Sequence, residues 1–271
     1  MSTNRETEFL QWILPQMGYR WAGFRKPRGQ VIKRIQNRMQ QLQLSGGYSQ
    51  YKIYLQANPG EWKHLEKLCD VTISKFFRDR ALWDYLRRDL LENLLLTNDN
   101  REVNIWSAGC CNGEEPYSIT ITVEMIAEEY PLKRPVSILA SDRNRQVLDR
   151  AKKRKYPAGA LKELTEDEIN SYFNKPKGKD EVYTLQSRLT KNVEFEIRDI
   201  RTSLPDQTFD ILFCRNLAFT YFNQKEQESF LSRIKSKIKP GCWLVIGSNE
   251  QLPSNDWLER YHHSHPIFRK V

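Results

Sequence analysis

The stretch WSAGCCNGEEPYS, residues 106–118, contains the features around which the rest of the chain is arranged. The apolar residues before it indicate a short strand that ends abruptly. Gly109 and Gly113 indicate a turn in which the backbone can approach a ligand closely. Pro116 suits the first turn of a helix, because its missing N–H and fixed φ cost nothing there. A strand, a glycine turn and a helix N-terminus together predict a site for a nucleotide-like ligand.

Two neighbouring carboxylates, Glu114 and Glu115, lie in this turn and restrict the ligand. They would repel a phosphate, so we expect a ligand that carries hydroxyls or positive charge. S-adenosylmethionine has a sulfonium, an α-amino group and a ribose, and it fits that description. A dinucleotide dehydrogenase is disfavoured because the turn lacks GxGxxG, and the absence of GxxxxGK[ST] excludes a P-loop NTPase.

Length and composition indicate an ordinary globular protein. The 271 residues can form one large domain or a large and a small one, and 39% are apolar while 28% are charged. No apolar run follows Met1, and no apolar stretch is long enough to span a bilayer. The five cysteines show no CxxC pattern, which is typical of free thiols in a reducing compartment. We therefore expect a cytoplasmic protein.

The net charge of +9 is concentrated near the N-terminus. Residues 9–60 contain no Asp or Glu, and this segment indicates an acidic partner: a protein surface, nucleic acid or, with less support, a membrane. The plainer alternative is a solvated helix face. The eight basic residues of the segment are Arg20, Arg25, Lys26, Arg28, Lys33, Arg34, Arg38 and Lys52.

The N-terminal part of the chain is predicted to be a helical domain that covers residues 1–70. Apolar residues recur at helical spacing in several short segments, separated by Gly and Pro. A loop is expected at 21–29, and helix 31–44 has one apolar and one basic face. The predicted helices are 8–20, 31–44, 48–57 and 61–69.

Residues 71–100 are predicted to link this domain to the next. In the segment VTISKFFRD, residues 71–79, we expect Phe76 and Phe77 to be buried and to hold Arg78 in a fixed place. A helix is predicted at 81–95, with its leucines and Trp83 in the core.

From residue 101 to 271 the pattern changes to alternating strands and helices, which predicts a Rossmann-like α/β domain with a parallel sheet. An insertion is expected at about 156–192, in which Thr165–Glu168 forms a capping box and 182–185 with 188–189 forms a small antiparallel excursion. A final edge strand is expected at 266–271. The other predicted strands are 103–108, 136–141, 193–197, 209–214 and 243–247, and the helices are 116–130, 144–153 and 225–238, the last closed by Pro240-Gly241.

Ligands of such sheets bind at the carboxyl ends of the strands. The polar residues at those ends are Glu114, Glu115, Asp142, Asp199 and the pair Arg215-Asn216. Asp142 follows the second strand, where a carboxylate commonly accepts from both ribose hydroxyls.

If the ligand is S-adenosylmethionine, the group that accepts its methyl can be predicted from the sequence after the fourth strand, CRNLAFTYF. Amino-group methylation of bases favours a proline-containing turn there, which this sequence lacks. A cysteine nucleophile normally follows proline, whereas Cys214 follows Phe213. A carboxylate acceptor needs neither, because it is already ionised at neutral pH and needs alignment rather than a general base.

These motifs resemble those of the CheR-type protein-glutamate methyltransferases, which esterify glutamate side chains of bacterial chemoreceptors. The resemblance covers nearly the whole chain, and GEEPYS together with FFRD and CRN is its most specific part. The residues that carry it, in the order of the family, are ISKFFRD (73–79), WSAGCCNGEEPYS (106–118), ASD (140–142), VLDRAK (147–152), FCRN (213–216), YF (221–222) and KPGCWLVIGSNE (239–250).

The resemblance implies a role for each matching residue. S-adenosylmethionine would be bound by residues at the strand ends, and a segment before the first strand would close over its methionine end and the acceptor. Arg78 and Tyr221 are the implied catalytic residues, with Arg78 able to orient the incoming carboxylate through two hydrogen bonds. Helix 31–44 would contact an acidic face of the target protein, and we expect a monomer. The implied cofactor-binding residues are Thr72, Ser74, Arg78, Glu115, Asp142 (ribose), Asp199 and Ile200 (adenine), Arg215 and Asn216.

The chain departs from the family in some places, and other functions remain open. One extra residue lies between CRN and YF, Thr72 and Asp199 stand where Asn is common, and the segment 174–192, which in some members docks a receptor tail, is short and lysine-rich. The alternatives are a nucleic-acid-binding protein or RNA methyltransferase that uses the basic N-terminal unit, and a degenerate methyltransferase that acts as a scaffold. No metal is expected, since the spacing of His262, His263 and His265 is poor for a metal site.

Overall fold

The computed structural model describes residues 2–176 and 182–271. Contacts along the chain define two compact units, each of which is described by itself. The first comprises Met1–Val71 and Asn216–Ser229, and the second comprises Thr72–Arg215 and Phe230–Val271. Residues 216–229, predicted to belong to the α/β domain, pack with the N-terminal helices instead.

The first unit consists of short helices around an aromatic and aliphatic core. The segment expected to be a loop at 21–29 contains a helical turn and the start of the next helix. Gly23 is required in that turn, because a Cβ there would lie 2.3 Å from the carbonyl oxygen of Thr220. The helices are α1 (Ser2–Gln16), α2 (Trp21–Phe24), α3 (Arg28–Gln41), α4 (Gly47–Ala57), α5 (Pro59–Leu68) and α11 (Ala218–Tyr221), while α12 (Gln224–Ile234) begins in this unit.

Two of the basic residues on α3 stabilise the first unit from within. Arg38 donates to both carboxylate oxygens of Glu61 at 2.9 and 2.8 Å, and Tyr51 donates to the same carboxylate at 2.9 Å. Glu61 is buried. Its hydrogen bond from Arg38 lowers the pKa of Glu61, although burial opposes this. Arg34 donates to the carbonyl oxygen of Leu68 at 3.0 Å, at the end of α5. The predicted basic face of this helix therefore presents less free charge than its sequence suggests.

The segment that follows the fourth parallel strand is held by Arg20. The Arg20 guanidinium donates to the carbonyl oxygens of Phe219 and Thr220, and its backbone N–H donates to the carbonyl oxygen of Tyr221 at 2.8 Å. The ring of Tyr221 lies edge-on to Phe24, with centroids 5.1 Å apart. Because these bonds involve Arg20, its charge also has a structural role.

The second unit is built on a seven-stranded sheet of order β6-β2-β1-β7-β8-β10-β9. Strands β6, β2, β1, β7 and β8 are parallel, and β10 pairs antiparallel with both β8 and β9. This arrangement confirms the predicted Rossmann-like α/β sheet. The strands are β1 (Val103–Ala108), β2 (Val136–Asp142), β6 (Val193–Ile197), β7 (Phe209–Cys214), β8 (Ile238–Ile246), β9 (Leu258–Arg260) and β10 (Ile267–Lys270).

Two expectations at the C-terminal side of the sheet are wrong. The last strand is not at the edge, because β10 pairs with β8 on one side and with β9 on the other. Pro240 and Gly241, expected to close a helix, lie inside β8, and α12 ends earlier, at Ile234. Strand β9 is only three residues long and gave no alternating pattern that could reveal it.

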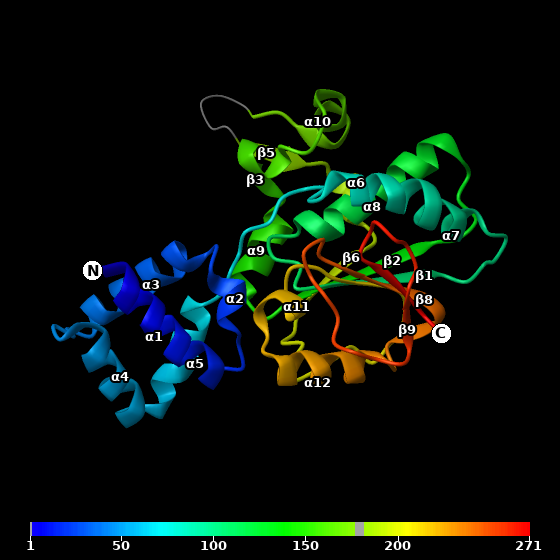
Figure 1. The fold of residues 1–271 in the computed structure, drawn as a ribbon. Helices are drawn as coiled ribbons and strands as arrows, with labels where there is room; N and C mark the ends of the chain where they lie inside the picture. The colour runs from blue at the N-terminus through cyan, green and yellow to red at the C-terminus, as the bar shows by residue number, and fades with distance from the viewer. Residues whose placement is uncertain (1, 177–181) are drawn as a thin grey trace. The chain divides into compact units, whose positions relative to one another are not determined.

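Helices α8 (Glu114–Glu129), α6 (Arg80–Tyr85) and α7 (Glu92–Leu96) lie over one face of this sheet (Figure 1). The predicted continuous helix 81–95 is interrupted by a π-helical segment, η1 (Leu86–Leu91). Trp83 is 1% exposed and stacks on Phe213 with an angle of 7° between the rings. The helix expected at 144–153 is α9 (Arg145–Lys153), with Asn144 as its cap.

The insertion forms a small three-stranded sheet of order β3-β5-β4. The capping box of Thr165 and Glu168 at the start of α10 is confirmed. Of the antiparallel excursion, residues 182–185 are a strand, whereas 188–189 lie in a 3-10 helix; residues 177–181 lie outside the described part of the chain. The elements are β3 (Lys155–Pro157), η2 (Ala158–Leu161), α10 (Glu166–Tyr172), β4 (Phe173–Asn174), β5 (Val182–Leu185) and η3 (Ser187–Thr190).

A search for membrane-spanning segments gave a negative result. Among the described residues, no helix combines the length and the apolar composition that crossing a bilayer requires.

Candidate active site

The glycine turn between β1 and α8 has the conformation that its sequence predicts. Gly113 is the N-cap of α8 with φ of 88°, and a Cβ there would lie 2.8 Å from the Cβ of Ala151. Only glycine therefore fits this position without strain. Cys110 and Cys111 are buried in the turn, and burial raises the pKa of both thiols. This agrees with a packing role for the two cysteines.

Asp142 ends β2 and turns its carboxylate toward the glycine turn. One carboxylate oxygen accepts from the backbone N–H of Cys111 at 3.0 Å, and the other accepts from the backbone N–H of Asn144 at 2.9 Å. These bonds hold the carboxylate in one orientation at the carboxyl edge of the sheet. Each oxygen has further lone pairs, so the group can also accept from ribose hydroxyls.

Glu115 lies in the first turn of α8. Its side chain bonds to Ser107 of β1 and to Arg215, the residue after β7. Its Oε1 accepts from the Ser107 hydroxyl at 2.7 Å, and its Oε2 accepts from Arg215 Nη1 at 3.2 Å. The side chain is 13% exposed. Burial raises the pKa of Glu115, although the positive charge of Arg215 opposes this. A carboxylate that is only partly neutralised attracts positive charge, as the sulfonium and α-amino groups of S-adenosylmethionine require.

Glu114 lies in the same helical turn but in a different environment. It is 3% exposed, and among the described residues its Oε2 has no hydrogen-bond partner. Its Oε1 accepts from the Asn112 side chain at 3.4 Å, and the nearby Ser74 hydroxyl favours its ionised form and so lowers its pKa. Burial raises the pKa of Glu114. The sequence predicted a charge at the helix end, and its spacing gave no signal that this carboxyl is buried against the segment that contains Ser74.

The segment before α6 is fixed as the sequence predicts, because Phe76 and Phe77 are 0% and 2% exposed. The carbonyl oxygen of Arg78 accepts from Arg215 Nη2 at 2.6 Å and from Trp83 Nε1 at 3.0 Å. The Arg78 guanidinium itself makes no hydrogen bond or ion pair within the described residues, and its charge acts on Glu115. The backbone of Arg78 is therefore anchored while its charged end remains available.

Asp199 and Ile200 follow β6 and have partners of their own. Asp199 accepts from Arg201, at 3.0 Å from the backbone N–H and 2.9 Å from Nη2. Burial would raise the pKa of Asp199, but these bonds and the charges of Arg201 and Arg143 lower it overall. Ile200 is buried, and its carbonyl oxygen accepts from Arg233 at 2.7 Å. The structure thus keeps Asp199 ionised, while its contact with an adenine remains a prediction, as does the role of the half-buried Thr72.

Asn216 and Tyr221 belong to the first unit and not to the unit that contains the other predicted site residues. Asn216 has φ of 55°, a left-handed conformation that Asn tolerates better than most residues. Their roles in the cofactor pocket and in catalysis remain predictions.

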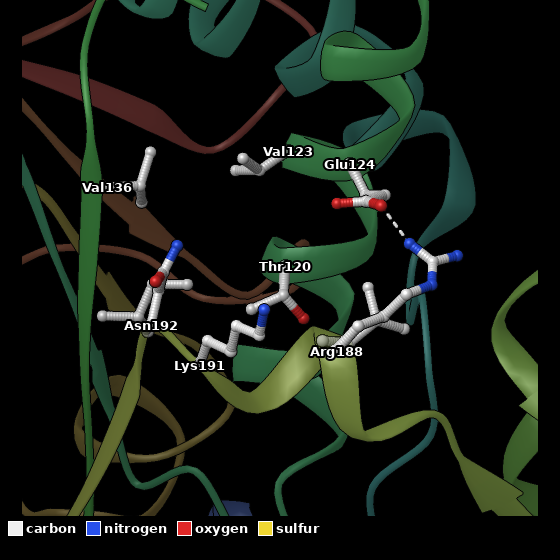
Figure 2. A pocket seen from close by; sticks show the side chains of 9 residues that line it. Thr120, Val123, Glu124, Val136, Arg188, Lys191 and Asn192 are labelled. Carbon is white, nitrogen blue, oxygen red and sulfur yellow. Dashed lines mark hydrogen bonds and ion pairs between the residues drawn. The ribbon is translucent and has the colours of Figure 1, made fainter.

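A small pocket of about 50 Å³ lies between α8, η3 and the start of β2. Figure 2 shows Glu124 and Arg188 joined by an ion pair beside it, with Thr120 and Lys191 among the other lining residues. The pocket holds no more than a few water-sized groups, and it lies near the beginning of β2, whereas Asp142 is at its end. It is therefore not the cofactor site. In the part of the chain that the structure describes, no cluster of His, Cys, Asp or Glu is arranged to hold a metal ion.

Comparisons with known proteins identify the family of this chain. Residues 72–267 match the family model described as CheR methyltransferase, SAM binding domain. The chain belongs to the CheR methyltransferase family. It is 30% identical to the chemotaxis protein methyltransferase of Escherichia coli over 82% of this chain and 76% of that protein. It is 31% identical to that of Listeria monocytogenes (70% and 73%) and 29% identical to that of Borreliella burgdorferi (78% and 76%).

Membership in the CheR family makes this chain an S-adenosylmethionine-dependent protein methyltransferase. The residues at the carboxyl ends of the strands fit this cofactor. Asp142 offers two oriented oxygens for hydroxyls, and Glu115 offers a partly desolvated carboxylate for positive charge. When bound, S-adenosylmethionine supplies an electrophilic methyl group.

Proposed function

We propose that this CheR-family enzyme forms methyl esters on glutamate side chains of a protein, which is a chemoreceptor or a related cytoplasmic signalling protein. The relatives are chemotaxis protein methyltransferases, and this supports a chemotaxis substrate. The proposed cofactor residues are those implied by the sequence: Thr72, Ser74, Arg78, Glu115, Asp142, Asp199, Ile200, Arg215 and Asn216.

The observation that carries this proposal is the state of Arg78. Its carbonyl oxygen is held by two donors, while its guanidinium has no hydrogen-bond or ion-pair partner among the described residues. A free guanidinium on an anchored backbone suits a carboxylate, which it can bind through two parallel hydrogen bonds. The glutamate is already ionised at neutral pH, so the enzyme needs to align its oxygen with the methyl group rather than remove a proton.

A methyl-transfer assay tests the proposed product. The purified enzyme is incubated with S-adenosylmethionine labelled in its methyl group and with the cytoplasmic fragment of a chemoreceptor, and the labelled protein is then treated with base. We expect the label to enter the protein and to be released as methanol, because esters hydrolyse in base. Label that stays on the protein after base, or that enters RNA instead, would contradict the proposal.

We also propose that the first unit contributes a positive surface to substrate binding. Arg20, Arg34 and Arg38 have partners inside this unit, so the exposed residues Arg25, Lys26 and Lys33 are the better candidates for contact with an acidic protein face. Within the predicted contact helix 31–44, the proposed contact residue is therefore Lys33. Arg25 and Lys26, in the turn before this helix, complete the proposed surface.

Reversing two of these charges is expected to weaken substrate binding. The double substitution Arg25→Glu and Lys33→Glu should raise KM for the acidic protein about tenfold at low salt, with the difference shrinking as salt is added. Lys63→Glu, an exposed change on α5 outside the acid-free segment, serves as the control. Initial rates against substrate concentration measure the effect. Equal KM values for the double variant and the control would exclude this surface.

A further inference from the structure

The turn before α6 holds two non-glycine residues in a conformation that such residues rarely adopt. Phe77 has φ of 48° and Asp79 has φ of 64°. Left-handed backbone is unfavourable for residues with a Cβ, so the surroundings must stabilise it. Phe77 is held by a bond from its N–H to the Ser118 hydroxyl, at 2.9 Å, and by edge-on packing against Trp83. Asp79 is held by a hydrogen bond that its carboxylate accepts from Arg215.

Asp79 occupies the N-cap position of α6 but does not cap it. An Asp at this position commonly accepts from the first N–H groups of the helix, whereas here no such side-chain bond is present. Its carboxylate instead accepts from Arg215 Nη2 at 2.8 Å. The backbone conformation thus directs a carboxylate away from the helix end and toward a buried cation.

Arg215 is shared between two carboxylates. Its Nη2 binds Asp79 and the Arg78 carbonyl oxygen, while its Nη1 binds Glu115. The Arg215 side chain is 3% exposed, and its guanidinium lies over the ring of Trp83, 5.7 Å from the centroid. The buried charge of Arg215 is therefore divided between Glu115, which is 13% exposed, and Asp79, which is 34% exposed, while the charge of Arg78 also acts on Glu115.

We propose that Asp79 is a positioning residue that competes with Glu115 for Arg215, so that the site keeps negative charge for the sulfonium of S-adenosylmethionine. This inference rests on the proposed role of Glu115 in cofactor binding. S-adenosylmethionine and its product S-adenosylhomocysteine share the adenine, the ribose and the amino acid, and they differ in the methyl group and its positive charge. Asp79 therefore favours the substrate form of the cofactor over the product form.

Asp79→Asn tests this proposal, because Asn has the same size, keeps an oxygen that can accept from Arg215 and tolerates left-handed backbone. Calorimetry compares the affinity of wild type and variant for each form of the cofactor. We expect affinity for S-adenosylmethionine to fall about threefold to tenfold and affinity for S-adenosylhomocysteine to change less than about twofold. Asp84→Asn is the matched control, since Asp84 is on the same helix and pairs with Arg80 instead.

Two further variants keep the outcome decisive. Asp79→Gly removes the carboxylate at a position whose φ suits glycine, so it should fold and show the same change in preference. Trp83→Phe removes the N–H bond to the Arg78 carbonyl but keeps the charges and an aromatic ring beside Arg215, so it should not alter the ratio of the two affinities. An equal loss for both forms of the cofactor in Asp79→Asn, or no loss, would overturn the proposal.

The test separates this inference from the proposals on which it builds. A wild-type enzyme that binds neither form of the cofactor would overturn the cofactor site and this inference with it. Wild-type binding with an unchanged ratio in both Asp79 variants would overturn the role of Asp79 alone. A failure to find base-labile methyl esters would reject the proposed substrate, while the affinity ratios would still decide the role of Asp79.

Discussion

Replacing Arg78 by alanine is expected to lower the rate of methyl transfer at saturating cofactor about a hundredfold. The guanidinium is the part of Arg78 with no partner among the described residues, so its loss removes the proposed contact with the glutamate carboxylate and disturbs few contacts of the fold. Misalignment of a reacting group by about 1 Å can cost a factor of that size. Initial rates with a chemoreceptor fragment measure the loss of turnover, and calorimetry measures cofactor affinity separately.

The same measurements separate orientation from charge. Arg78→Lys keeps a positive charge but cannot form two parallel hydrogen bonds, so its rate should stay below about a tenth of the wild-type rate. Arg88→Ala is the control, because Arg88 is an exposed arginine nearby in the sequence and its removal should leave the rate unchanged. Cofactor affinity should fall much less than the rate does in Arg78→Ala, since Glu115 and Asp142 remain to bind the cofactor. Unchanged turnover in Arg78→Ala would contradict the proposed role.

Replacing Glu115 by glutamine should weaken S-adenosylmethionine binding about tenfold to a hundredfold. The amide can still accept from Ser107, but the site loses the negative charge that opposes Arg215 and attracts the cationic cofactor. The pKa of Glu115 is raised by burial, so protonation removes this attraction at a higher pH than for an ordinary carboxyl. In the wild type, affinity should therefore fall as pH falls through that raised pKa, and the variant should lack this part of the pH dependence.

Glu114→Gln is the matched control for this experiment. Glu114 is the neighbouring residue, and it is buried with a raised pKa and hydrogen bonds from Asn112 and Ser74 that an amide can also accept. We expect its replacement to change cofactor affinity by less than about threefold. If Glu114→Gln abolished binding while Glu115→Gln did not, the assignment of the cofactor carboxylate would be reversed.

Only part of the site could be predicted from the sequence. Residues placed by the ends of strands were found, whereas residues placed by contacts between distant parts of the chain were not. Asp142 ends a strand, and Glu115, Asp199 and Arg215 each come after one, so parallel pairing alone brings them to one edge of the sheet. The contributions of Ser107, Asp79 and Trp83 were missed. Ser107 and Trp83 lie in regular elements that predict a core position, and Asp79 was read only as part of the motif FFRD.

Several errors in the predicted fold have the same origin. Strand β10 was assigned to the edge because a strand's neighbours are not encoded in its own residues, and the short β9 shows no period of its own. Pro240 and Gly241 are typical of a helix end, but strand β8 continues through them. Helix 31–44 is predicted to contact an acidic partner, but Arg34 and Arg38 bind groups of the same unit that lie 34 and 23 residues away in the chain.

The sequence by itself determined the strand–turn–helix at 103–129, the capping box at Thr165 and the burial of Phe76 and Phe77. The first two features depend on hydrophobic period, on backbone conformation and on contacts within a few residues. The burial of Phe76 and Phe77 follows from their large apolar side chains, although the residues that cover them, such as Tyr156 and Phe173, are distant in the chain. Only the tertiary structure decided which carboxylates share Arg215, because Glu115 and Asp79 lie 100 and 136 residues from it in the chain. Contacts over such distances leave no periodic signal, and they exist only once the sheet has placed β1, β7 and the turn before α6 together.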